Sequence, residues 1–76
     1  MEHFLDNGIC VKIDVGDLIY LQWELPNKRY LVVKYLIVGE YDTELNSYPA
    51  YKIKPYSFCR FYVSNLKFNE FQIFKT

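Results

Sequence analysis

The sequence is poor in the residues on which most enzyme and metal sites depend. It has one histidine and two cysteines among 76 residues, and neither cysteine belongs to a spacing typical of zinc sites. A nucleophile–base pair would need His3, and the sequence holds no G-x-S-x-G motif or phosphate-binding glycine loop. These absences predict a protein that is not an enzyme and that needs no metal or cofactor.

The chain also lacks an excess of either charge and any long apolar run. Lys plus Arg and Asp plus Glu number nine each, whereas general nucleic-acid binders are usually basic, because phosphate neutralisation supplies much of their affinity. No apolar run approaches the roughly 20 residues of a membrane-spanning helix, and residues 1–4 lack the basic start of a signal peptide. Cys10 and Cys59 are expected to be buried free thiols. We therefore expect a cytoplasmic protein that does not enter a membrane.

Aromatic side chains and short alternating patterns are what the sequence has in abundance. Aromatic residues make up 20% of the chain, and each large ring can bury roughly 150–250 Å², which favours one small folded domain. Apolar and polar residues alternate in several short runs, while no helical period persists. Five strands are expected, over residues 9–13, 18–25, 30–38, 51–63 with an interruption at Pro55, and 70–74.

Turn residues separate these runs. Gly16 permits a tight turn, and Pro26-Asn27 predicts an antiparallel hairpin between residues 18–25 and 30–38. Residues 39–50 show no clear pattern and are interpreted as a long loop.

A single helical turn at Leu66–Phe68, capped by Ser64 and Asn65, is expected before the last strand. These elements predict an all-β fold: a five-stranded antiparallel barrel over residues 9–76, preceded by an N-terminal tail over residues 1–8. Its expected core consists of Ile19, Leu21, Trp23, Leu31, Val33, Ile37, Ile53, Phe61 and Val63.

Three segments resemble a Src-homology-3-like barrel. They are V-G-D-L-I-Y-L at residues 15–21, the Pro-Asn hairpin, and Y-V-S-N-L at residues 62–66 ahead of a terminal strand. In that family a Gly-Asp turn opens a long strand, and one helical turn precedes the last strand. The peptide-binding branch has an A-L-Y-D-Y-type opening and a tryptophan pair, which this chain lacks, so binding of proline-rich motifs is not implied. An oligonucleotide-binding barrel would satisfy the same strand count.

Surplus apolar surface predicts a protein partner. The strand over residues 30–38 is almost as apolar on its outward side as on its core side, and no second sheet is expected to cover it. Tyrosine and arginine are enriched where proteins meet. The predicted partner-binding residues are Tyr20, Tyr30, Val32, Tyr56, Arg60 and Tyr62. A homodimer that buries the same surface is the alternative.

The stretch over residues 51–62 interleaves basic and aromatic residues and gives a second hypothesis, a nucleic-acid-binding small barrel. Basic side chains would follow phosphates while the rings stack on bases. The residues concerned are Lys52, Lys54, Tyr56, Phe58 and Arg60. The same pattern is typical of cross-strand pairs on an ordinary strand, and the zero net charge favours that interpretation.

The composition, rich in Phe, Tyr, Ile, Asn and Lys, is similar to that of accessory proteins of bacteriophages and mobile elements. Such proteins often act by binding and blocking a host protein. The resemblance implies a non-catalytic protein that binds another protein, a host factor, and inhibits or modulates it.

Overall fold

The computed structural model describes residues 1–54 and 56–75, and Pro55, where the sequence predicts an interruption, lies outside them. The described residues form an all-β structure, as expected, with two short 3₁₀ turns and no α-helix. The strands are β1 (Glu2–Phe4), β2 (Cys10–Lys12), β3 (Leu18–Leu25), β4 (Arg29–Ile37), β5 (Ser47–Ile53), β6 (Ser57–Tyr62) and β7 (Glu70–Phe74). The 3₁₀ turns are η1 (Pro26–Lys28) and η2 (Val63–Lys67).

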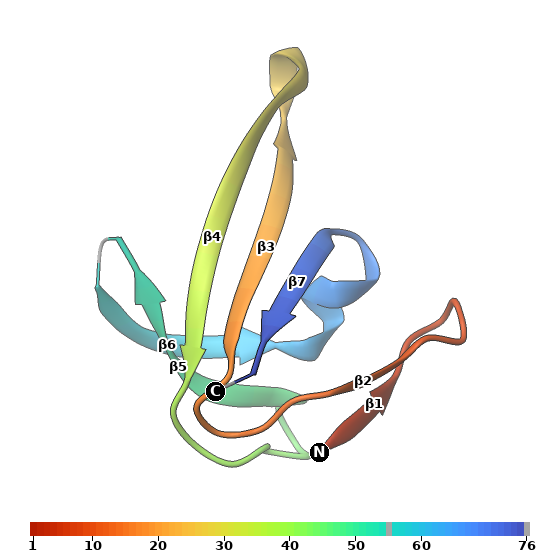
Figure 1. Ribbon diagram of the computed structural model, residues 1–76, viewed down its shortest axis with the longest axis vertical. Coiled ribbons are helices and arrows are strands. Elements are labelled where there is room, and N and C mark those ends of the chain that lie inside the picture. The colour runs from red at the N-terminus through yellow and green to blue at the C-terminus, as the bar shows by residue number, and fades with distance from the viewer. Residues whose placement is uncertain (55, 76) are drawn as a thin grey trace.

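The strands form two separate antiparallel sheets (Figure 1). β1 pairs with β2, and the other five strands form a sheet in the order β6-β5-β4-β3-β7. The hairpin predicted at Pro26-Asn27 is confirmed as the β3–β4 pair. Within the described residues β6 and β7 remain the two edges of the larger sheet, so the predicted closed barrel of five strands is wrong.

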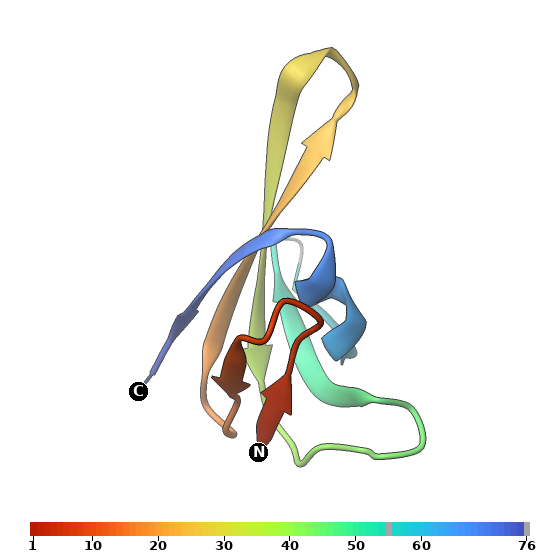
Figure 2. The ribbon, with the colours of Figure 1, turned by 90° about the vertical axis from the view of Figure 1, so that its right-hand side faces the viewer.

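The N-terminal hairpin contributes side chains to the core of the larger sheet. Residues 1–8 are not a separate tail, because they contain β1 and place His3 and Leu5 in the interior. Leu5, Val11 and Ile13 belong to the same buried cluster as residues of the larger sheet. Figure 2 shows this hairpin lying across the sheet. Its side chains therefore bury apolar area against a sheet whose two edges stay unpaired.

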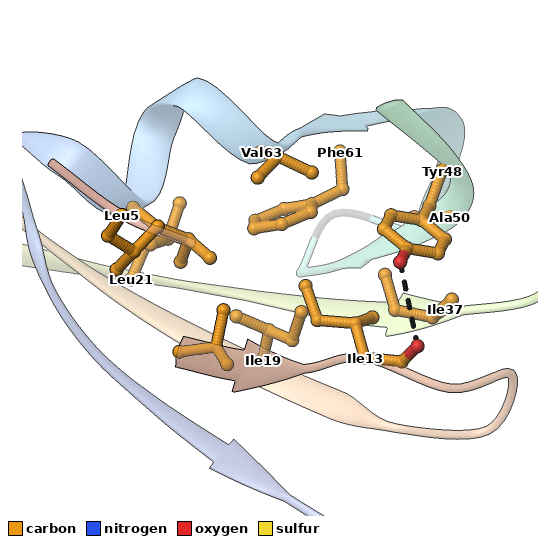
Figure 3. Packing of buried hydrophobic residues seen from close by; sticks show 11 residues of the cluster. Leu5, Ile13, Ile19, Leu21, Ile37, Tyr48, Ala50, Phe61 and Val63 are labelled. Carbon is orange, nitrogen blue, oxygen red and sulfur yellow. Dashed lines mark hydrogen bonds between the residues drawn. The ribbon is translucent and has the colours of Figure 1, made fainter. Parts of the chain in front are cut away.

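The core lies on the face of the larger sheet that meets the N-terminal hairpin (Figure 3). Of the nine predicted core residues, six are buried: Ile19, Leu21, Val33, Ile37, Phe61 and Val63. Trp23 and Ile53 are only half-buried, and Leu31 is 49% exposed. Trp23 and Leu31 lie on the inner face, but the sheet there extends past the part that the rest of the chain covers. Ile53 pairs with Lys34 and points to the opposite side of the sheet, so its prediction as a core residue is wrong.

The far end of the β3–β4 hairpin stands clear of the body, and we call residues 23–33 the arm (Figures 1 and 2). β7 pairs with β3 only as far as Gln22, and β5 pairs with β4 only from Lys34 onward. At the tip, Asn27 has φ 74° and Lys28 has φ 58°. Asparagine tolerates this left-handed region, as the turn prediction required.

The interpretation of residues 39–50 as a loop was wrong for the last four residues of that range. β5 begins at Ser47, and Tyr48 and Ala50 are buried in the core. Proline and alanine are uncommon in strands, so Pro49 and Ala50 gave no indication that a strand begins before residue 51. The helical turn before β7 is confirmed, but it starts at Val63, and no side-chain cap is formed at its start.

Both cysteines are free thiols, as expected, but the expectation that they are buried is wrong. Cys10 is exposed and Cys59 is half-buried. Cys10 lies on the outward side of β2, where Val11 alone of the three strand residues faces the core. The alternation of a three-residue strand could not fix which side would face inward.

Gly39 makes a close approach that predicts a measurable cost of substitution. A methyl group at this position would lie 2.5 Å from Cγ of Pro49, and a proline ring cannot rotate away. We expect Gly39→Ala to lower the free energy of unfolding, measured by urea denaturation, by about 1–2 kcal/mol. The same substitution in a Pro49→Ala background should cost clearly less, and an equal cost in both backgrounds would contradict the steric explanation.

Candidate partner-binding face

The strand register places most of the predicted partner-binding residues on one side of the larger sheet. In the β3–β4 pair, Tyr20 lies opposite Lys34, Gln22 opposite Val32, and Glu24 opposite Tyr30. Directly opposed residues of an antiparallel pair point to the same side. This side is opposite to the one that carries Ile19 and Leu21 into the core.

The same side continues across β5 and β6. Leu36 pairs with Tyr51, and Tyr51 pairs in turn with Phe58. Arg60 and Tyr62 follow Phe58 at alternate positions of β6. We call this side of the five-stranded sheet the outer face. Its exposed large apolar residues, each between 44% and 63% exposed, are Tyr30, Val32, Tyr51, Phe58, Tyr62 and Phe74.

Five of the six predicted partner-binding residues therefore lie on the outer face: Tyr20, Tyr30, Val32, Arg60 and Tyr62. The sixth, Tyr56, precedes β6 and is 78% exposed. Sequence reasoning missed Tyr51 and Phe74. Only the pairing of Tyr51 with β6 and of Phe74 with β3 assigns these rings to the outer face, and no short-range pattern in the sequence gives that register.

Ring contacts hold several of these aromatic side chains in place. The Tyr20 and Phe74 ring centroids lie 4.9 Å apart, and Nζ of Lys34 lies 5.0 Å from the Tyr20 centroid. On the β5–β6 part of the face, Tyr51 and Phe58 meet edge to face with centroids 5.5 Å apart. Side chains already ordered in the free protein lose less entropy when a partner covers them.

Arg60 contributes to the structure of the face as well as to its surface. Its side chain is half-buried, and Nε donates a hydrogen bond of 2.6 Å to Oγ of the buried Ser47. This bond joins β5 to β6 beside Tyr62, which pairs with Ser47. A substitution of Arg60 would therefore disturb the sheet itself, so it is a poor test of partner binding.

The structure does not bring the proposed nucleic-acid residues together on one face. Lys52 pairs with Ser57 and so points to the side opposite Phe58 and Arg60. Lys54 lies beyond the end of β5, with φ 61°. A groove that tracks a phosphate backbone needs its basic side chains along one surface, and this arrangement separates them.

Two hollows flank the arm where β7 begins, and Gln22 and Glu70 line both. The smaller, of about 200 Å³, lies between Tyr20, Val32 and Gln72. The larger, of about 410 Å³, is lined by Gln22, Trp23, Glu24, Tyr30, Phe68, Asn69 and Glu70. Neither hollow was predictable from the sequence, because each depends on the point along β3 at which the pairing with β7 begins.

A buried polar contact joins the N-terminal hairpin to β5. Nε2 of His3 lies 2.6 Å from the hydroxyl of Tyr48, which also lies 3.5 Å from the carbonyl oxygen of Ile13. Burial lowers the pKa of His3 and raises the pKa of Tyr48 to about 12. Both side chains are therefore neutral at pH 7, and the contact fixes β1 against the core.

Residues 1–54 and 56–75 contain no group of three or more His, Cys, Asp or Glu side chains that could hold a metal ion. In the same part of the chain, no helix is long and apolar enough to cross a membrane. Comparisons with protein-family models, curated proteins and solved structures gave no match.

Proposed function

We propose that this protein is a binding module whose outer face docks on another protein. The observation that carries the proposal is the row of half-exposed rings and aliphatic side chains across all five strands of one sheet face. Monomeric soluble proteins rarely expose contiguous apolar patches larger than a few hundred Å² unless the patch is functional. Rings of this face also contact one another, as at Tyr51 and Phe58.

The composition of the face is that of an interface. Tyrosine and phenylalanine supply its apolar area, while Gln22, Lys34 and Gln72 place polar groups among and beside them. Interfaces typically combine an aromatic centre with a polar rim. The resemblance in composition to mobile-element proteins favours a host protein as the partner, and inhibition or modulation of that protein as the outcome.

The test is a pull-down with purified chain from a lysate of the cells that express it, treated with nuclease. Tyr51→Ala combined with Phe58→Ala should reduce recovery of the partner at least tenfold, since central aromatic residues dominate binding energy. Val15→Ala is the matched control, because Val15 is 49% exposed but precedes β3 and lies off the outer face. Thermal melting should show that both variants remain folded.

Undiminished recovery by the folded Tyr51/Phe58 variant would contradict the proposal. So would recovery of nucleic acid alone from lysate that has not been treated with nuclease. In that case the affinity for the recovered nucleic acid should fall steeply as the salt concentration rises. The affinity of Lys52→Ala would then be compared with that of wild type.

A further inference from the structure

The arm is the least supported part of the sheet. Along residues 23–25 of β3 and 29–33 of β4, the described chain provides pairing on one side only. Leu25 is 40% exposed, Tyr30 60% and Leu31 49%, so both faces of the arm carry apolar side chains in water. A two-stranded ribbon is at best marginally stable by itself. Its apolar faces and open edges favour association with another chain.

The larger hollow at the base of the arm has the chemistry of a site for a basic side chain. Two carboxylates, of Glu24 and Glu70, and three aromatic rings, of Trp23, Tyr30 and Phe68, contribute to its lining. Carboxylates pair with guanidinium and ammonium groups, and aromatic faces attract the same cations. Within the described residues, neither glutamate takes part in an ion pair.

The tip of the arm carries the complementary charge. Lys28 and Arg29 are adjacent, exposed and, in the described part of the chain, not engaged in an ion pair. Lys28 sits in the left-handed region, with φ 58°, so the turn presents the two basic residues at the extreme end of the hairpin. Each molecule thus presents a basic tip and, between the hairpin and the start of β7, an acidic and aromatic hollow.

We propose that the arm binds a second copy of this chain. The tip residues Lys28 and Arg29 of one copy enter the hollow lined by Glu24 and Glu70 of the other. Two arms that lie antiparallel place each tip at the base of the other arm, so both contacts form at once around a twofold axis. The exposed side chain of Tyr30, which lies on the same side of the arm as Glu24, then becomes buried between the copies, and the zero net charge of the chain imposes no overall repulsion.

This inference goes beyond the proposed function, because its partner is the chain itself and its contacts lie on the arm and at Glu70, the first residue of β7. Analytical ultracentrifugation of the purified full chain over a range of concentrations tests it. Wild type should sediment as a dimer whose dissociation constant rises with salt. The double variant Lys28→Glu/Arg29→Glu and the double variant Glu24→Lys/Glu70→Lys should each raise that constant at least tenfold.

An equimolar mixture of the two charge-reversed variants provides the sharpest result. Like charges then meet in each homodimer, whereas in the mixed pair both tips meet hollows of opposite charge. The mixture should therefore recover an affinity close to that of wild type. All four residues are exposed, so the melting temperatures should stay close to that of wild type and show that the variants are folded.

A wild-type chain that remains monomeric at every concentration would overturn the inference, as would reversed variants that dimerise normally or a mixture that fails to associate. If wild type is monomeric and Glu24→Lys/Glu70→Lys loses a partner from lysate, the hollow serves a basic segment of another protein, and the inference is again wrong. The Tyr51→Ala/Phe58→Ala variant should still dimerise, which separates this contact from the proposed function.

Discussion

Replacement of Phe61 by alanine is expected to lower the free energy of unfolding by about 3–5 kcal/mol. Phe61 is 0% exposed and belongs to the buried cluster (Figure 3). Its ring centroid lies 5.3 Å from that of Tyr35. Deleting the ring removes its apolar burial and leaves a cavity among the residues of the buried cluster. Because small domains have only about 5–15 kcal/mol of total stability, much of the variant should be unfolded at 37 °C. Thermal melting, monitored by circular dichroism, measures this loss of stability.

Trp23→Ala is the matched comparison for this prediction. The alternation of the sequence predicts that Trp23 lies in the core, yet in the structure the indole is only half-buried at the base of the arm. Its replacement should therefore cost clearly less than the replacement of Phe61, although tryptophan is the larger side chain. A Phe61→Ala protein with the melting temperature of wild type would contradict the placement of the core under β5 and β6. So would a larger loss of unfolding free energy for Trp23→Ala than for Phe61→Ala.

Acid should destabilise the protein through His3. Burial holds the pKa of His3 below its ordinary value of 6.5, so the folded state binds this proton less readily than the unfolded state. The stability linked to His3 is complete above pH 6.5 and is lost as the pH falls from 6.5 through the lowered pKa of the folded state. Urea denaturation at a series of pH values should show this decline, and His3→Gln should flatten it. An unchanged pH profile in His3→Gln would assign the decline to other groups.

Tyr48→Phe tests the partner of the same histidine. The substitution removes the hydroxyl that lies 2.6 Å from Nε2 of His3 and leaves the ring in place. A buried nitrogen without a partner and the lost hydrogen bond together should cost about 2–3 kcal/mol. Tyr62→Phe is the control, since Tyr62 is 45% exposed on the outer face, and its loss of a hydroxyl should have little effect. Equal stabilities of the two variants would show that the contact with His3 contributes little.

The parts of the fold that were predictable from the sequence depend on neighbours along the chain. Alternation over residues 18–25 and 30–38, with Pro26 and Asn27 between them, specifies the β3–β4 hairpin and its register. That register is the reason why Tyr20, Tyr30 and Val32 were correctly placed on one side. The all-β class follows from the same alternation.

The errors concern contacts between distant segments. Nothing local in residues 1–8 shows that Leu5 will be covered by the larger sheet, so the N-terminal strand was missed. The side to which Lys52 points depends on the register between β5 and β6, which the sequence of the turn does not specify. The exposure of Leu31 depends on how far β5 and β7 reach along the hairpin, a property of the assembled sheet.

The order of the strands has a consequence for folding kinetics. β3, β4, β5 and β6 follow one another as successive hairpins, whereas β7 returns to pair with β3, as in the pair Ile19 and Ile73. Contacts between distant residues form late, because the chain must lose the entropy of closing a long loop before the contact stabilises it. The four-strand meander should therefore form before β7 docks. Until it does, the edge of β3 from Leu18 to Leu25 is open along its whole length, which makes this intermediate the state most prone to aggregate.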